Sequence, residues 1–152
     1  MKDSQHIGSS FENRQDFKQL LRSNQLKVTK PRLRVLDIID HKESAISQPD
    51  LEKILGSEID RVTLYRILAS FEEKGILHKV FDLNGTATYA ICSTGCTARH
   101  HHDQHVHFIC STCNSVFCLD EITMPSIRVP AGFSLHSIAI NAVGVCDKCQ
   151  SL

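Results

Sequence analysis

Apolar residues in the first part of the chain recur at helical spacing in four stretches. Each stretch places apolar residues on one side, which predicts amphipathic helices packed around a common core. Thr29 and Ser47 precede the second and third stretches as candidate N-caps, and Gly56 and Gly75 follow the third and fourth as stop signals. The apolar sides consist of Phe17, Leu20 and Leu21; Leu33, Leu36 and Ile39; Leu51, Ile54 and Leu55; and Leu64, Leu68 and Phe71.

Two β-like runs follow these helices, ILHKVF at 76–81 and TATYAI at 86–91. Asn84-Gly85 between them is a strong hairpin signal. Short helices closed by a β-hairpin indicate a winged helix-turn-helix, in which the second helix of the turn enters the major groove of DNA. We therefore interpret residues 60–74 as the recognition helix.

Thr63, Arg66 and Ser70 lie together on the side of this helix that its apolar residues leave open. An arginine in that position can donate two hydrogen bonds to guanine O6 and N7. The alternative is that Arg66 is solvated, or pairs with Glu73 or a phosphate. The helical pattern around Arg66 favours the base contact.

The formal net charge of the chain is zero, but its distribution is uneven. Seven basic residues stand between Arg14 and Arg34 against one acid, Asp16. A local basic stripe can meet phosphates even when the whole protein is neutral. A solvated surface is the alternative.

The second part of the chain holds six of the seven cysteines. Two C-x-x-C pairs, Cys110 with Cys113 and Cys146 with Cys149, have the spacing of knuckles that direct two sulfurs at one ion. Redox pairs or disulfides are the alternatives, but neither pair starts a helix after a strand as a thioredoxin-like site would. The pattern predicts one structural, tetrahedral Zn²⁺ site.

Histidines are concentrated just before the first knuckle, in HHHDQHVHFIC at 100–110. His105 and His107 alternate with apolar residues, so on a strand both imidazoles would leave from one face and could bind one metal. Solvent-facing histidines in a loop are the alternative. The run of His100, His101, His102 and Asp103 has no periodicity, and could bind a further metal loosely or remain free.

Taken together, these motifs resemble the ferric-uptake-regulator (Fur) family of bacterial metal-dependent repressors. The resemblance runs from about residue 15 to 149 and is carried by the segments LKVTKPRLRVLDII, ISQPDLEKIL, IDRVTLYRILASFEEKGILHKV, HVHFICSTC and GVCDKC. It implies an α+β fold: a winged-helix DNA-binding domain at 1–92, then a small α+β dimerisation domain at 93–152 with an antiparallel sheet and the Cys₄ zinc site. It also implies a homodimer that reads a palindromic operator in double-stranded DNA.

The zinc uptake regulators (Zur) are the members most similar to this chain, because Cys92 ends the wing strand in YAIC. This likeness implies a regulatory Zn²⁺ site made by His78, Cys92, His105 and His107. The thiolate-containing set suits Zn²⁺ better than iron or manganese. An iron-sensing or peroxide-sensing repressor is the alternative. Candidates for an additional metal site are His101, His102, Cys118 and His136, and the candidates for DNA contact are Lys27, Lys30, Arg32, Thr63, Tyr65 and Arg66.

The regulatory site constrains the hairpin. A two-residue loop at Asn84-Gly85 would send His78 and Cys92 to opposite faces. A three-residue loop, Leu83-Asn84-Gly85, pairs His78 with Ala90 and puts His78 and Cys92 on one face. We predict the three-residue loop.

The chain departs from the family pattern at several places. Cys118 stands where a glutamate is common, either as an alternative ligand or as a buried structural thiol. Pro49 stands where some relatives carry an aromatic DNA contact. The long helix usual between the knuckles is missing, and PSIRVP at 125–130 predicts a short turn or strand.

We expect a cytoplasmic protein that neither enters a membrane nor catalyses a reaction. The N-terminus MKDSQHIGSS lacks the apolar core of a signal peptide, and no apolar run approaches the roughly 20 residues that span a bilayer. A zinc hydrolase or deaminase would need a motif such as H-x-E with P-C-x-x-C, which the sequence lacks.

Overall fold

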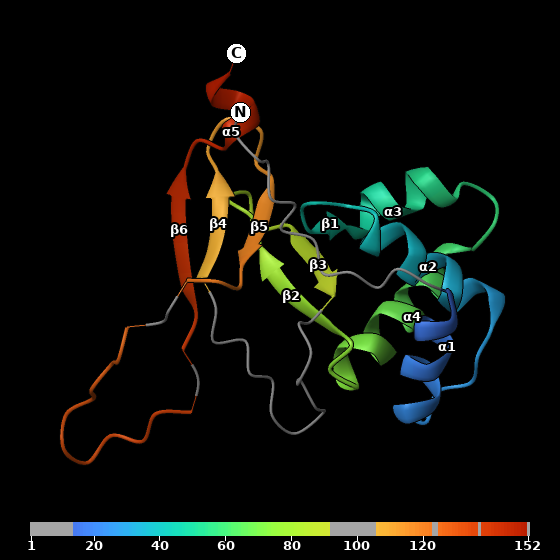
Figure 1. The fold of residues 1–152 in the computed structure, drawn as a ribbon, viewed down its shortest axis with the longest axis horizontal. Coiled ribbons are helices and arrows are strands. Elements are labelled where there is room, and N and C mark those ends of the chain that lie inside the picture. The colour runs from blue at the N-terminus through green and yellow to red at the C-terminus, as the bar shows by residue number, and fades with distance from the viewer. Residues whose placement is uncertain (1–13, 92–105, 123–124, 137, 152) are drawn as a thin grey trace, which may run out of the picture.

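The computed structural model describes residues 14–91, 106–122, 125–136 and 138–151. They form two units that lie side by side (Figure 1). The N-terminal unit, residues 14–91, contains four helices and a three-stranded sheet. The C-terminal unit, residues 106–151, contains a second three-stranded sheet and a short helix.

The four helices of the N-terminal unit begin and end close to the predicted signals. Thr29 caps α2 by accepting from the Arg32 N–H, Ser47 caps α3 through the Asp50 N–H, and Asp60 caps α4 through the Thr63 N–H. The helices are α1 (Arg14–Ser23), α2 (Lys30–Asp40), α3 (Gln48–Leu55) and α4 (Arg61–Glu73).

The wing is the hairpin of β2 (Leu77–Phe81) and β3 (Ala87–Ile91), and β1 (Ile46–Ser47) pairs with the outer side of β3. The predicted register is confirmed, since His78 pairs with Ala90. Asp82 closes a three-residue loop by donating its N–H to the carbonyl of Thr86, and Gly85 takes the left-handed conformation with φ +77. Cys92, which follows β3, lies outside the described residues.

The core of the N-terminal unit is built from the predicted apolar sides of the helices, except that Ile54 of α3 is 41% exposed. Leu21, Leu36, Leu51, Leu64 and Phe71 are fully buried, one or more from each helix. Leu77 and Tyr89 close this core from the sheet. The N-terminal unit therefore has its own hydrophobic core, and this core holds α4 in place.

The sheet of the C-terminal unit has the order β5-β4-β6. The predicted antiparallel sheet is present as β4 (Val106–Cys110) with β5 (Val116–Leu119), while β6 (Ile140–Gly144) extends it in parallel with β4. Helix α5 (Asp147–Gln150) follows β6 and carries the second knuckle. The parallel strand is an addition to the predicted sheet, made possible by the long connection from β5 to β6.

Residues 125–130 form neither a helix nor a strand, and residues 125–136 are exposed throughout. The prolines at both ends of SIRV prevent regular pairing there. Few apolar side chains are buried in this unit; those of β4 and β5 are Val106, Ile109 and Val116. Among the described residues, no helix is long and apolar enough to cross a membrane.

Candidate metal centres and nucleic-acid interface

Four cysteines converge at the end of the C-terminal sheet. Cys110 and Cys113 come from the turn between β4 and β5, and Cys146 and Cys149 from the start of α5. Their sulfurs all lie within 4.8 Å of one another. A tetrahedral zinc with Zn–S bonds of about 2.3 Å separates its sulfurs by about 3.8 Å, and Cys113 and Cys146 Sγ are 3.9 Å apart. The four residues could hold one Zn²⁺ with little movement.

Backbone hydrogen bonds to the sulfurs of this cluster favour the binding of a cation. The N–H groups of Cys113 and Cys146 donate to Cys110 Sγ at 3.5 and 3.4 Å, and these bonds lower the pKa of Cys110 to about 6. Hydrogen bonding of the Cys149 thiol to Cys146 raises its pKa to about 12. One sulfur is thus stabilised as a thiolate while another keeps its proton until a cation replaces it.

A second cluster joins the two units. His78 of β2, His107 of β4 and Cys118 of β5 bring their ligand atoms within 4.8 Å of one another. His78 Nε2 lies 3.0 Å from Cys118 Sγ, and the rings of His78 and His107 are 5.4 Å apart between centroids. Both histidines are buried and the cysteine is half-buried. Two imidazoles and a thiol are ligands that Zn²⁺ takes at about 2.1 and 2.3 Å, so this cluster could bind an ion between the units.

Strand register explains how these three side chains meet. His107 pairs directly with Cys118 across β4 and β5, so the two side chains leave one face of the sheet. His78 reaches the same face from the wing. His107 is one of the predicted ligands, and the structure places its imidazole beside that of His78.

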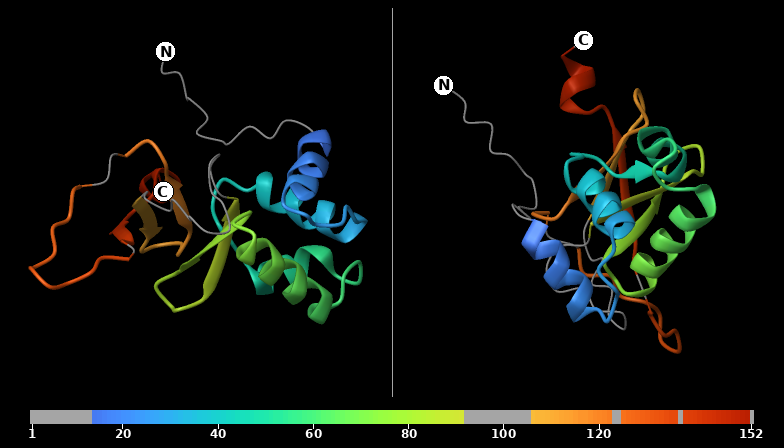
Figure 2. Two further views of the ribbon diagram at one scale, coloured as in Figure 1. Left: turned by 90° about the horizontal axis from the view of Figure 1, so that it is seen from below. Right: turned by 90° about the vertical axis from the view of Figure 1, so that its right-hand side faces the viewer.

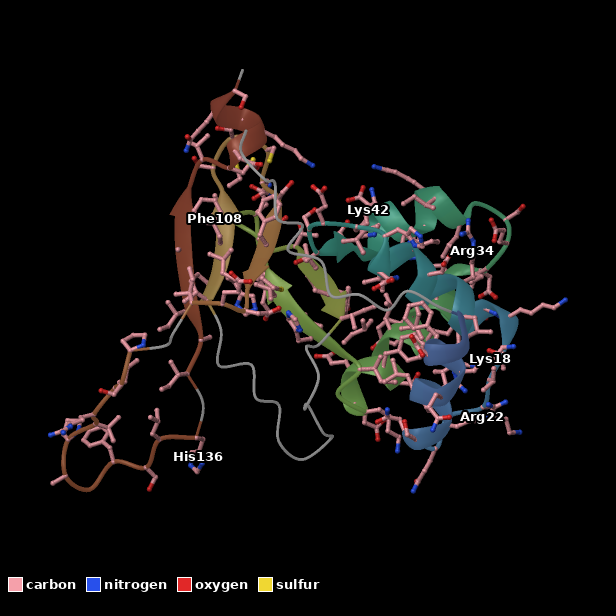
Figure 3. The ribbon with its side chains drawn as sticks, in the orientation of Figure 1. Lys18, Arg22, Arg34, Lys42, Phe108 and His136 are labelled. Carbon is pink, nitrogen blue, oxygen red and sulfur yellow. The ribbon has the colours of Figure 1, made fainter. Side chains whose placement is uncertain are left out.

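Of the remaining predicted ligands, the structure describes His136 alone. Cys92 and His105, expected in the regulatory site, lie outside the described residues, as do His101 and His102. His136 is exposed on the long loop before β6, well away from the wing (Figure 3). Cys118 therefore lies with His78 and His107 and not with His136, the other described candidate for the additional site.

Sequence reasoning gave Cys118 too little weight. Val116 and Cys118 are two residues apart on β5, so both side chains leave the same face of the strand. The pairing of that strand with β4 depends on the knuckle turn, whose length the sequence does provide. A register drawn from Cys110-x-x-Cys113 would have placed Cys118 opposite His107.

The candidate nucleic-acid surface lies on the side of the N-terminal unit away from the second sheet, where Lys18 and Arg22 project from α1 (Figure 3). Lys27 is exposed between α1 and α2, and Lys30 is exposed as the first residue of α2. Arg32 is half-buried, and its guanidinium donates to the carbonyl of Lys27 at 2.7 Å. Arg32 thus shapes the turn that presents the two lysines.

The outer side of α4 is exposed at Val62, Tyr65 and Arg66, while Thr63 is half-buried. The Thr63 hydroxyl donates to Asp60, and this bond lowers the pKa of the Asp60 carboxyl. Thr63 therefore serves the N-cap of α4, whereas Tyr65 and Arg66 extend outward. The basic and aromatic side chains of α4 have the character of a major-groove reading surface.

The chain is similar to known metalloregulators over most of its length. The sequence pattern of the ferric uptake regulator family matches residues 23–142. The ferric uptake regulation protein of Neisseria meningitidis serogroup B is 34% identical over 139 residues, covering 86% of this chain and 91% of the relative.

Solved structures agree with this likeness. A zinc uptake regulator bound to zinc and DNA matches with a TM-score of 0.68 and 25% identity, covering 92% of this chain and 94% of the other. The ferric uptake regulator of Vibrio cholerae shares the fold at a TM-score of 0.58 and 23% identity, covering 85% and 98%. The chain belongs to the ferric uptake regulator family, whose members are transcription regulators and not enzymes.

Proposed function

We propose that the protein is a zinc-responsive repressor that binds a palindromic operator as a homodimer and controls genes for metal uptake. The observation that carries this proposal is the cluster of His78, His107 and Cys118, which brings ligands from both units within reach of one ion. Cys92 and His105 remain the predicted further ligands of this regulatory site. The Cys₄ cluster is proposed to hold a second, structural zinc.

The regulatory metal is inferred from ligand chemistry. A thiol beside two imidazoles favours Zn²⁺, whereas Fe²⁺ and Mn²⁺ sensors gain more from carboxylate oxygens. Among the described residues, no carboxylate joins the three ligands of this cluster. A relative named for ferric uptake regulation supports the iron alternative, and the zinc uptake regulator structure supports zinc.

Zinc would act by favouring one arrangement of the two units. Only an arrangement that brings β2 against β4 and β5 offers the ligands together, so the ion stabilises that arrangement by its differential affinity. The recognition helix α4 is fixed to the wing through the core of the N-terminal unit. Holding the wing therefore sets the position of α4 relative to its copy in the dimer.

Dimerisation is inferred from the apolar surface of the C-terminal unit. Phe133, Leu135 and Val143 are 70%, 46% and 59% exposed, and β6 is an edge strand. An exposed apolar surface beside an open strand edge is a common feature of subunit interfaces. We assign residues 1–92 to DNA binding and 93–152 to dimerisation, and place the protein in the cytoplasm, where its thiols stay reduced.

The proposal is tested by titrating operator affinity with Zn²⁺, Fe²⁺ and Mn²⁺ under reducing conditions. The operator is first selected from random duplex DNA by the zinc-loaded protein. We expect zinc to raise affinity at a free concentration where the other two ions do not. A stronger response to Fe²⁺ would establish the iron alternative, and loss of binding on peroxide treatment of an iron-loaded form would establish the peroxide sensor.

A further inference from the structure

The contact between the units continues beyond the metal ligands. His78 and Val80 on β2 and Asp82 directly after it stand at every second position, so their side chains leave one face of the wing. The wing lies between the helices and the second sheet (Figures 1 and 2). Each of the three residues meets the C-terminal unit at a different level. The metal cluster is only the first of these levels.

The second level is apolar. Val80 is buried with Ile109 and Val116, which are paired on β4 and β5, and Ala45 packs against the three. The Ala45 N–H donates to the carbonyl of Val116 at 2.8 Å. This cluster takes one side chain from the wing and two from the second sheet, so it exists only while the units are in contact.

The third level lies at the structural zinc knuckle. Asn114 follows Cys113 directly and has a positive φ of 60, which points its amide at the wing turn. Its Nδ2 donates to Asp82 Oδ2 at 2.9 Å, and its Oδ1 accepts from the Leu83 N–H at 3.2 Å. Asp82 Oδ1 meanwhile accepts the N–H groups of Asn84 and Thr86, so both carboxylate oxygens are engaged.

The other knuckle also reaches the N-terminal unit. Lys148, between Cys146 and Cys149, forms an ion pair with Glu43 in the connection before β1. Both side chains are 68% exposed, and an ion pair so exposed contributes little. The amide of Asn114 is the stronger contact, because one side chain satisfies two groups of the wing turn and one bond is to a carboxylate.

We propose that Asn114 is a positioning residue for DNA binding: through Asp82 and Leu83 it docks the wing on the structural zinc knuckle, independently of the regulatory metal. This inference rests on the proposed function for its DNA readout, but not for the docking itself. The Cys₄ site then has a second role, since it fixes the turn that presents Asn114. Regulatory zinc acts at the His78 end of an interface whose Asn114 end is already formed.

The sharpest test swaps the side chains of Asp82 and Asn114. In Asp82→Asn or Asn114→Asp alone, two like groups face each other across the contact. In the double variant, the new amide at position 82 can donate to the new carboxylate at position 114. That carboxylate can still accept from the Leu83 N–H, and the turn bonds to the side chain at position 82 survive. We expect each single variant to weaken operator binding at saturating zinc by about tenfold, and the double variant to regain most of that loss.

Asn114→Gly removes the amide while permitting the positive φ. Its matched control is Lys148→Ala, which removes the exposed ion pair of the other knuckle with Glu43. We expect Asn114→Gly to weaken operator binding as the single variants do, and Lys148→Ala to leave it near wild type. Asp82→Asn lies outside the knuckle, so it reports on the contact even where an Asn114 variant loses structural zinc.

Amide hydrogen exchange tests docking without DNA or regulatory zinc. In protein that holds structural zinc alone, we expect the Leu83 amide to exchange about tenfold faster in Asn114→Gly than in wild type, with Leu64 of α4 unchanged. Unchanged exchange at Leu83, or a double variant no better than the singles, overturns the inference. A wild-type protein that ignores zinc would overturn the proposed function alone, since the exchange result stands by itself.

Discussion

His78 Nε2 and Cys118 Sγ lie 3.0 Å apart although 40 residues separate them in the chain. One belongs to the wing and the other to β5 of the second sheet. Their approach depends on packing between the units, so any change of that packing changes the distance between two candidate ligands. Metal binding by these two residues therefore depends on how the two units are arranged.

Replacing Cys118 by alanine should weaken zinc binding at the regulatory site by about 100-fold or more, because losing even a supporting contact of a ligand costs about 10–100-fold. Zinc-dependent operator binding should fall with it, while the structural zinc remains. Chelator competition gives the affinity, and with Co²⁺ at the regulatory site and Zn²⁺ kept at the Cys₄ cluster, thiolate charge-transfer absorption should decrease in the variant. Cys96→Ala is the control, since it removes a thiol with no proposed ligand role. A Cys118→Ala protein with normal zinc response would rule out ligation by this residue.

Zinc binding at the Cys₄ cluster should depend on pH in a defined direction. Cys110 has a pKa of about 6 and is a thiolate at neutral pH, whereas Cys149 has a pKa of about 12 and must release its proton to the buffer when zinc binds. Affinity should therefore fall as the pH is lowered through neutrality. It should fall more steeply below about pH 6, where Cys110 is protonated as well.

Calorimetric titration in two buffers of different ionisation enthalpy measures the protons released. The number released per zinc should increase when the pH is lowered from neutral to below the pKa of Cys110. Equal numbers at both pH values would show that Cys110 does not change its protonation state in this pH range, and would contradict a pKa of about 6.

Local chemistry allowed much of the fold to be predicted. Thr29 and Ser47 satisfy helix N–H groups within three residues of themselves, so their capping roles can be read from the sequence. The caps depend on neighbours along the chain. The register of His78 with Ala90 is predicted from the ligand set that the family resemblance implies, because that set requires His78 and Cys92 on one face.

The features that were missed depend on contacts distant in sequence. The parallel pairing of β6 with β4 is set across a long connection whose residues 125–136 are exposed and form no helix or strand that would indicate the pairing. Cys118 is in the site because β5 pairs with β4 and the wing packs on both. The knuckle turn indicates the pairing of β5 with β4, but the packing of the wing on these strands leaves no pattern in the sequence, so sequence reasoning did not place Cys118 beside His78.

Arg66→Ala should cost about 1–3 kcal/mol of operator binding and relax the preference for one base pair, because a bidentate contact to guanine is lost. Arg66 is exposed on α4, and its guanidinium makes no hydrogen bond or ion pair within the described ranges, so its loss should not disturb the fold. Arg66→Lys is the matched control: it keeps the charge but not the paired donors, so selectivity should fall while salt dependence stays. Binding curves on single-base operator variants measure both. If affinity and selectivity are unchanged in Arg66→Ala, α4 does not read the operator through this residue.

Lys27, in the turn before α2, and Arg32, in the first turn of α2, should respond differently to replacement by alanine. Lys27→Ala should weaken binding to all sequences alike and lower the slope of log affinity against log salt by about one unit, because one phosphate contact is lost. Arg32 donates to the carbonyl of Lys27 at 2.7 Å, so Arg32→Ala should also loosen the turn that presents the lysines. Arg32→Ala should therefore lose more operator affinity than Lys27→Ala, and amide exchange should increase at residues 27–29. Equal effects of the two variants, with unchanged exchange in this turn, would show that Arg32 contributes only its charge.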